Sequence, residues 1–167
     1  MSDKAKKIFF TLTIVVPFLL YCVYYYSHMI KNAPYKFTEF KSFVIKYGTS
    51  DSMLNQYNSK TGDYQYLNRK DSLIKTNLLL HNSDLLYLHR KAAELGFWDF
   101  PQQELADTTK IKGKPLRYYI EFNYRRKSKK VWFDESFAGD PKLKDANENL
   151  ITEIKHILAN AEERNKK

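Results

Sequence analysis

The densest group of charged side chains is a run of cations between residues 125 and 130. Guanidinium and ammonium groups bind phosphates and carboxylates, so this run suits lipid headgroups, lipopolysaccharide or an acidic partner. Aromatic neighbours Tyr119, Trp132 and Tyr124 favour such a role, because rings beside cations are common at binding surfaces. The candidate site for an anionic or protein partner comprises Arg125, Arg126, Lys127, Lys129, Lys130, Tyr119 and Trp132. The alternative interpretation is a solvated hairpin tip, whose charges keep aromatic strands from pairing with other chains.

One nucleophile motif occurs, at Ser72 and Lys75, with the Ser-x-x-Lys spacing of penicillin-binding enzymes. That chemistry needs serine and lysine on one face of a helix, so that the amine can activate the hydroxyl. The segment is predicted to be a strand, in which an offset of three residues places the two side chains on opposite faces. The companion Ser-Asp-Asn and Lys-Thr-Gly elements are also missing from the sequence, so we do not expect catalysis here.

The sequence does not support metal binding or acid–base catalysis either. The histidines, which we expect at the surface or at the membrane boundary, are scattered as His28, His81, His89 and His156. No pair of them has the one-turn helical spacing of a zinc site. A possible acidic cluster lies in a polar loop, where solvated carboxylates are expected, and comprises Asp99, Glu104 and Asp107. The sequence therefore predicts a protein that is not an enzyme and that holds no cofactor and no metal.

An apolar segment at residues 8–30 carries no full charge. As a helix it would span about 34 Å, enough to cross a hydrocarbon core of about 30 Å. Tyrosines gather at its C-terminal end, as in an interfacial aromatic belt. A cleaved signal peptide is the alternative, but no small-x-small cleavage site follows the segment. We therefore predict a single-pass anchor in the plasma (inner) membrane.

The orientation of this anchor is not decided by counting positive charges, because lysines flank the span on both sides. A short lysine-bearing tail before a first span usually stays in the cytoplasm, and large following domains translocate regardless of charge. We expect the soluble domain outside the cytoplasm, in the periplasm.

Composition fits one domain plus this appendage. The chain has 167 residues and a net charge of +9, and its single cysteine, Cys22, lies in the apolar segment. Such a length suggests one domain with its own core. The predicted organisation is a polar tail (1–7), a transmembrane helix (8–30), a linker (31–38), a soluble α+β domain (39–163) and a charged tail (164–167).

Alternating apolar residues predict about six strands. The expected strand regions are residues 42–47, 53–58, 64–68, 71–80, 116–124 and 130–134. Hairpin connections imply an antiparallel sheet. In the last hairpin, Leu116, Tyr118, Ile120, Phe122 and Tyr124 share one face.

Two amphipathic helices are expected to cover this sheet, in the order β-β-β-β-α-β-β-α. Asn82 or Ser83 caps the first helix, and Gly96 ends it. The apolar stripe of that helix is Leu85, Leu88, Ala92 and Leu95. Asp140 and Pro141 begin the second helix, with proline at the first helical position. The buried stripe there is Leu143, Ala146, Leu150, Ile154, Ile157 and Ala161.

Residues 71–101 combine the first striped helix with the run Gly96-Phe97-Trp98-Asp99-Phe100-Pro101. This segment resembles uncharacterised small α+β domains of envelope lipoproteins from Bacteroidota-like bacteria. With the following hairpin and helix, the resemblance extends over about two thirds of the soluble part. The chain departs from that pattern by having a transmembrane anchor. The resemblance implies an envelope location and no known activity.

Three functions are consistent with these features. The first is a membrane-anchored, non-enzymatic binding or assembly domain of a bacterial cell envelope, whose outer aromatic and basic sheet face meets an anionic lipid or a protein partner. The second is a membrane-anchored immunity or inhibitor protein, which gains tight binding from a concentrated charged patch. The third is an enzyme acting on envelope lipid or glycan, which needs a cleft around a carboxylate such as Asp99 or Glu121. Nucleic acid is not an expected partner, because no recognisable nucleic-acid motif occurs.

Overall fold

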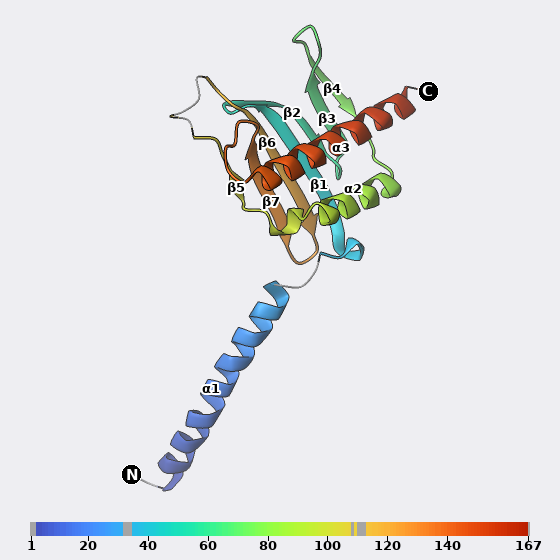
Figure 1. Cartoon of the computed structure of the whole chain (residues 1–167). Helices are drawn as coiled ribbons and strands as arrows, with labels where there is room; N and C mark the ends of the chain where they lie inside the picture. Colours follow the sequence, from blue (N-terminus) through green and yellow to red (C-terminus); the bar gives the residue numbers. More distant parts are fainter. Residues whose placement is uncertain (1–2, 32–34, 108, 110–112, 167) are drawn as a thin grey trace. The chain divides into compact units, whose positions relative to one another are not determined.

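A computed structural model describes residues 3–31, 35–107, 109 and 113–166 of the chain (Figure 1). The chain divides into two compact units, Met1–Tyr35 and Lys36–Lys167.

The first unit is the helix α1, Asp3–Lys31, which contains the apolar span predicted at residues 8–30. Its Asp3–Tyr26 part is long and apolar enough to cross a membrane, and it is the one such segment among the described residues. Thr11 and Thr13 donate their hydroxyls to the carbonyl oxygens four residues earlier, at 3.0 and 2.8 Å. These polar groups are therefore satisfied within the helix, as a hydrocarbon environment requires. The helix fits a single-pass membrane anchor or a signal sequence.

The second unit has the predicted α+β architecture, built on a seven-stranded mixed sheet in the order β4-β3-β2-β1-β6-β7-β5. The strands are β1 Phe40–Thr49, β2 Ser52–Asn58, β3 Asp63–Leu67, β4 Leu73–Asn77, β5 Gln103–Glu104, β6 Leu116–Tyr124 and β7 Ser128–Asp134. Neighbouring strands are antiparallel, except that β5 runs parallel to β7. The sequence predicts the other six strands but not β5, because two residues cannot display an alternating pattern.

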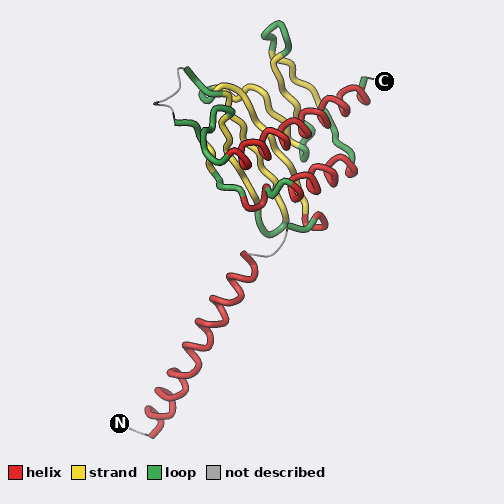
Figure 2. Tube along the Cα trace, viewed as in Figure 1, coloured by secondary structure: helices red, strands yellow, loops and turns green. Residues whose placement is uncertain are grey.

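Two helices, α2 Asn82–Glu94 and α3 Pro141–Asn165, lie across the same face of the sheet (Figure 2). The cap of α2 is His81 and neither of the predicted residues, Asn82 or Ser83. The backbone N–H of His81 donates to the Asp84 carboxylate at 3.0 Å. Asp140 caps α3 as predicted, by accepting the Lys142 N–H at 2.9 Å. Two short 3-10 helices are also present. The first, η1 Phe37–Glu39, precedes β1, and the second, η2 Phe97–Asp99, follows α2.

Gly96 ends α2 in the left-handed conformation, with a φ of 78°. A side chain would be strained at this φ, which explains the predicted glycine stop. The next residue, Phe97, is fully buried against the ring of Phe122 on β6, with 5.4 Å between ring centroids. The turn therefore fixes the end of α2 to the middle of the sheet.

The core lies between the helices and the sheet. On the predicted inward face of β6, Tyr118, Ile120, Phe122 and Tyr124 are buried, and Leu116 at the start of the strand is half-buried. Apolar side chains of both helices cover them, and the largest fully buried aliphatic side chains include Ile45, Leu78, Leu88, Ile120, Leu150 and Ile154. Of the residues predicted in the helix stripes, Leu85, Leu95, Leu143 and Ala146 are only half-buried, since they lie near the helix ends. The helices pack closely on the sheet, so displacing them along it would cost free energy.

Candidate binding surface

The face of the sheet opposite the helices, called here the outer face, carries a row of side chains that runs across all seven strands. Side chains alternate between the two faces of a strand, so strand register decides which residues share a row. The row reads Lys75, Gln65, Gln56, Lys46, Tyr119, Trp132 and Gln103. Each of these side chains is half-buried or exposed. The outer face thus presents amides, ammonium groups and two aromatic rings to its surroundings.

Tyr119 and Trp132 form the aromatic centre of this row. They are register partners on β6 and β7, and their ring centroids lie 4.6 Å apart at an interplanar angle of 50°. The Tyr119 hydroxyl donates to Glu121 Oε2 at 2.8 Å. Burial, followed by this hydrogen bond and the carboxylate charge, raises the pKa of Tyr119. The phenol therefore stays protonated at neutral pH and acts as a fixed hydrogen-bond donor.

The predicted cationic run does not form one surface. Strand alternation sends Lys130 to the outer face, where Glu121 is its register partner. Lys129 points the other way and donates to the backbone carbonyl of Phe100, beside η2. Burial lowers the pKa of Lys129, against the opposing charges of Asp99 and Glu104. Lys129 therefore joins the packing between β7 and the segment after α2.

The remaining cations, Arg125, Arg126 and Lys127, form the turn between β6 and β7. Arg126 makes a bidentate ion pair with Glu39, in which Nε donates to Oε2 at 3.2 Å and Nη2 donates to Oε1. The backbone N–H of Arg125 donates to the Glu39 carbonyl at 2.8 Å. The hydrogen bond from Arg126 is the main cause that lowers the pKa of Glu39. This turn is therefore fixed to η1, at the beginning of β1.

Tyr124 has the orientation that the alternation of β6 predicts, so its expected place among the rings of the binding surface is wrong. The side chain is buried on the helix-covered face, and its hydroxyl lies 2.6 Å from His89 Nδ1. The surface position expected for His89 is wrong for the same reason, since this residue is 8% exposed and contacts the rings of Phe37 and Trp98. Burial, then the charge of Arg90, lowers the pKa of His89.

The solvated position expected for Glu104 is also wrong, whereas Asp99 and Asp107 are exposed as expected. Glu104 is 1% exposed and accepts a hydrogen bond from Asn147 Nδ2 of α3 at 2.7 Å. Its other oxygen, Oε1, and Asn147 Oδ1 have no hydrogen-bond partner within the described part of the chain. Burial raises the pKa of Glu104 to about 7, against the effects of the Lys129 charge and the Asn147 hydrogen bond.

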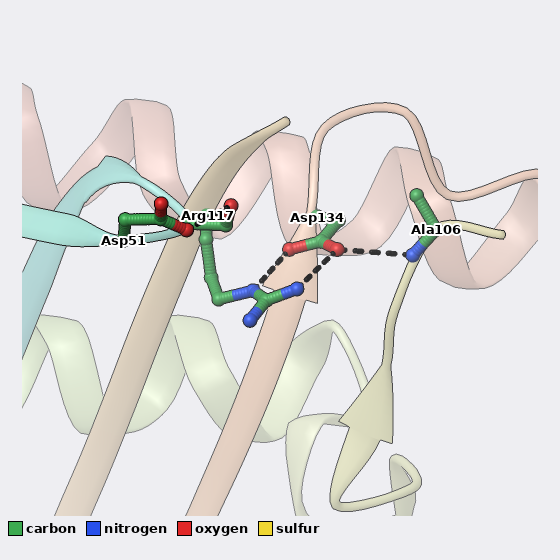
Figure 3. A network of polar contacts seen from close by, with 5 residues as sticks. Asp51, Ala106, Arg117 and Asp134 are labelled. Atoms are coloured by element: carbon green, nitrogen blue, oxygen red, sulfur yellow. Dashed lines mark hydrogen bonds and ion pairs between the residues drawn. The ribbon is translucent and has the colours of Figure 1, made fainter. Parts of the chain in front are cut away.

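A second buried carboxylate, Asp134 of β7, lies beside the segment that follows the edge strand β5 (Figure 3). Arg117 of β6 is its register partner, and the two side chains form a bidentate ion pair. The backbone N–H of Ala106, just after β5, donates to Asp134 Oδ2 at 3.0 Å. Both oxygens thus have partners, so this carboxylate holds the segment after β5 against the sheet.

The outer face is hollowed beside Lys46, in a cavity of about 170 Å³. Its lining residues are Val44, Lys46, Gln56, Tyr57, Asn58 and Asp63. Ligand pockets usually measure about 300–1,000 Å³, so this hollow suits a protruding side chain better than a metabolite. Neither Asp99 nor Glu121, the carboxylates considered for an enzymatic cleft, lines it. Among the residues that the structure describes, no group of three or more His, Cys, Asp or Glu side chains is arranged to hold a metal ion.

Comparison of the chain with protein-family models, with curated proteins and with solved structures finds no match in any of the three.

Proposed function

We propose that the chain is a single-pass membrane protein whose second unit is a non-enzymatic binding domain of a bacterial cell envelope, and that a partner protein binds its outer face. The observation that carries this proposal is the ring pair of Tyr119 and Trp132, register partners on the outer face of the sheet. Aromatic residues are enriched at protein interfaces, where they dominate the free energy of binding.

The surroundings of this ring pair fit a protein better than a small molecule. The ammonium groups of Lys46 and Lys130 lie next to the ring pair on the outer face, and the amides of Gln56 and Gln65 continue the polar row across β2 and β3. A polar rim around an aromatic centre is the usual anatomy of a protein interface. The 170 Å³ hollow beside Lys46 provides a place for one partner side chain.

The envelope location rests on two features. The apolar helix α1 is followed by a unit of its own, as in a tethered domain. The second feature is a prediction from the sequence, the expected resemblance of residues 71–101 to segments of envelope lipoproteins. A phosphatase fused after Lys167 tests the proposed orientation, because this enzyme is active only outside the cytoplasm. Activity confined to a cytoplasmic reporter would place the second unit on the other side.

The binding role is tested by placing a photo-crosslinking amino acid at Gln56, on the outer face, in the full-length protein in native membranes. We expect a discrete crosslinked partner at this position. The double variant Tyr119→Ala, Trp132→Ala should reduce its yield by at least about tenfold, since central aromatic truncations commonly cost 2 kcal/mol or more. The matched control is Tyr87→Ala, which removes a 44% exposed tyrosine from α2. Equal crosslinking in the double variant and in the wild type would overturn the proposal.

A further inference from the structure

The chain enters the second unit beside the turn between β6 and β7. Residues 36–39 lead into β1, and Glu39 holds this turn through its carbonyl, bound by the Arg125 N–H, and through its carboxylate, bound by Arg126. Figure 1 shows η1 and this turn at one end of the sheet, with the β3–β4 turn at the opposite end. The contacts are internal to the second unit, so this end is a fixed feature of its fold.

Four cations gather around the single carboxylate of Glu39. Arg126, Lys36 and Arg125 each lower its pKa, and Lys127 also interacts electrostatically with it. We call the group of Lys36, Arg125, Arg126 and Lys127 the basic end. Residues 35–41 and 124–130 contain no acidic residue besides Glu39. One carboxylate cannot neutralise four cations, so the basic end keeps a local excess of positive charge.

The side chains of the basic end are accessible. Lys36, Arg125 and Arg126 are exposed, and Lys127 is half-buried. The Arg126–Glu39 pair orders the turn, so less side-chain entropy is lost when its cations meet a surface. Such an arrangement of cations, three of them exposed, suits a planar array of anions.

The connection to α1 is short. The helix ends at Lys31 and the second unit begins at Lys36. A covalent connection of this length reaches at most about 18 Å. If α1 is held in a membrane, as the proposed function states, headgroups therefore lie within reach of the end where the chain enters the second unit.

We propose that the basic end binds the anionic phospholipid headgroups of the membrane that holds α1. This contact turns the basic end of the sheet toward the bilayer. The outer face is then not covered by lipid and can bind a partner. The inference rests on the anchoring part of the proposed function, and it adds a lipid contact to it. Each cation near an anionic surface strengthens binding roughly fivefold, and salt screens the effect.

The test uses the full chain in lipid nanodiscs, of phosphatidylcholine alone or mixed with phosphatidylglycerol. Cys22→Ser removes the one native cysteine, and Ser128→Cys places a fluorophore at the turn. A lipid with a quencher on its headgroup then reports contact. We expect at least threefold stronger quenching in anionic discs at about 10 mM salt, where the screening length is about 30 Å, and loss of the difference at about 1 M. A label at Lys70→Cys, in the β3–β4 turn, should not respond.

Charge variants distinguish binding by the basic end from a general attraction between the basic protein and anionic lipid. Lys36→Gln, Arg125→Gln removes two cations of the basic end but leaves the Arg126–Glu39 pair in place. The matched control, Arg69→Gln, Lys70→Gln, removes two exposed cations from the β3–β4 turn. We expect the first variant to lose most of the quenching at position 128 and the control to keep it, with equal thermal midpoints for both.

Each outcome has a defined meaning. Equal quenching in neutral and anionic discs, or equal quenching in both charge variants, overturns the lipid contact. A response to free inorganic phosphate in neutral discs, equal to that of anionic lipid, also overturns it, because the site would then bind single anions. Failure of the chain to elute with the discs overturns the anchor itself, and this is measured on the same samples.

Discussion

Arg117 and Asp134 face each other across β6 and β7, with Arg117 Nε 2.6 Å from Asp134 Oδ1 and Nη2 2.9 Å from Oδ2 (Figure 3). The Asp134 carboxylate has no exposed surface, whereas the Arg117 side chain is 20% exposed. Asp134 Oδ2 also accepts the Ala106 N–H. One buried anion therefore joins the neighbouring strands β6 and β7 and the segment after β5.

We expect Asp134→Asn to lower the free energy of unfolding by about 3 kcal/mol, because removing one charge of a buried pair leaves the other uncompensated. The amide also replaces one acceptor with a donor that faces the Arg117 guanidinium. Denaturant unfolding of the full chain in mild detergent, followed by tryptophan fluorescence, measures the loss. The control is Asp51→Asn, which breaks the exposed ion pair with Lys114 and should leave the midpoint unchanged. Equal midpoints for the two variants would show that the buried pair adds little.

A second prediction concerns pH and Glu104. Its pKa is raised from 4.5 to about 7 in the folded protein. Between these values the folded state binds more protons at Glu104 than the unfolded state, so the contribution of Glu104 to stability is greatest below pH 4.5 and is lost as pH rises through 7. A shift of this size corresponds to a loss on the order of 3 kcal/mol. The proton has a structural role, since a protonated Glu104 Oε1 can donate to Asn147 Oδ1, where both acceptors otherwise lack a partner.

Glu104→Gln tests this assignment. Glutamine keeps the shape and supplies a permanent N–H donor to Asn147, so the variant should be more stable than the wild type at pH 8 and similar at pH 4. His89, whose lowered pKa destabilises the fold on acidification, is present in both proteins and cancels in the difference. Unfolding curves at several pH values give this difference. If the two proteins differ by the same free energy of unfolding at every pH tested, Glu104 does not titrate near pH 7.

The success of the sequence predictions depends on how many residues carry each pattern. β6 has the predicted limits, Leu116–Tyr124, because nine alternating residues display a clear period of two. β5 has two residues, and tertiary contacts hold it: Trp132 donates its N–H to the Gln102 carbonyl, and Ala106 is bound by Asp134. Such contacts have no local sequence signal. Glu104 was misplaced in a solvated loop for the same reason.

The structure separates residues that the sequence analysis grouped into one candidate site. Lys129 and Lys130 are neighbours in the chain, but strand alternation sends them to opposite faces. Applying that alternation to residues 128–134 would have separated them from the sequence alone. His89 adjoins Leu88 on the buried side of α2, and a wider stripe would have included it. The ion pair between Arg126 and Glu39 joins residues 87 positions apart, which no periodicity predicts.

A third prediction concerns the helices that cover the sheet. Leu88 of α2 is 1% exposed and Ile154 of α3 is 0% exposed. Leu88→Ala and Ile154→Ala should each lower the free energy of unfolding by about 2–5 kcal/mol, through lost apolar burial and the cavity that remains. Leu79→Ala, at a 61% exposed position, is the matched control and should change it by less than about 0.5 kcal/mol. Losses as small as the control at both sites would contradict the packing of these helices.

The fourth prediction is that deletion of residues 1–30 leaves a folded, water-soluble protein. The buried hydrophobic residues of the described structure all lie between Phe43 and Ala161, so the deletion removes no side chain from the core. The apolar side chains of α1 are themselves exposed in the structure, and their removal should abolish detergent dependence. We expect the shortened chain in buffer to unfold at the same denaturant midpoint as the full chain in detergent. Aggregation of the shortened chain, or a midpoint clearly below that of the full chain, would show that α1 contributes to the fold of the second unit as well as to its attachment.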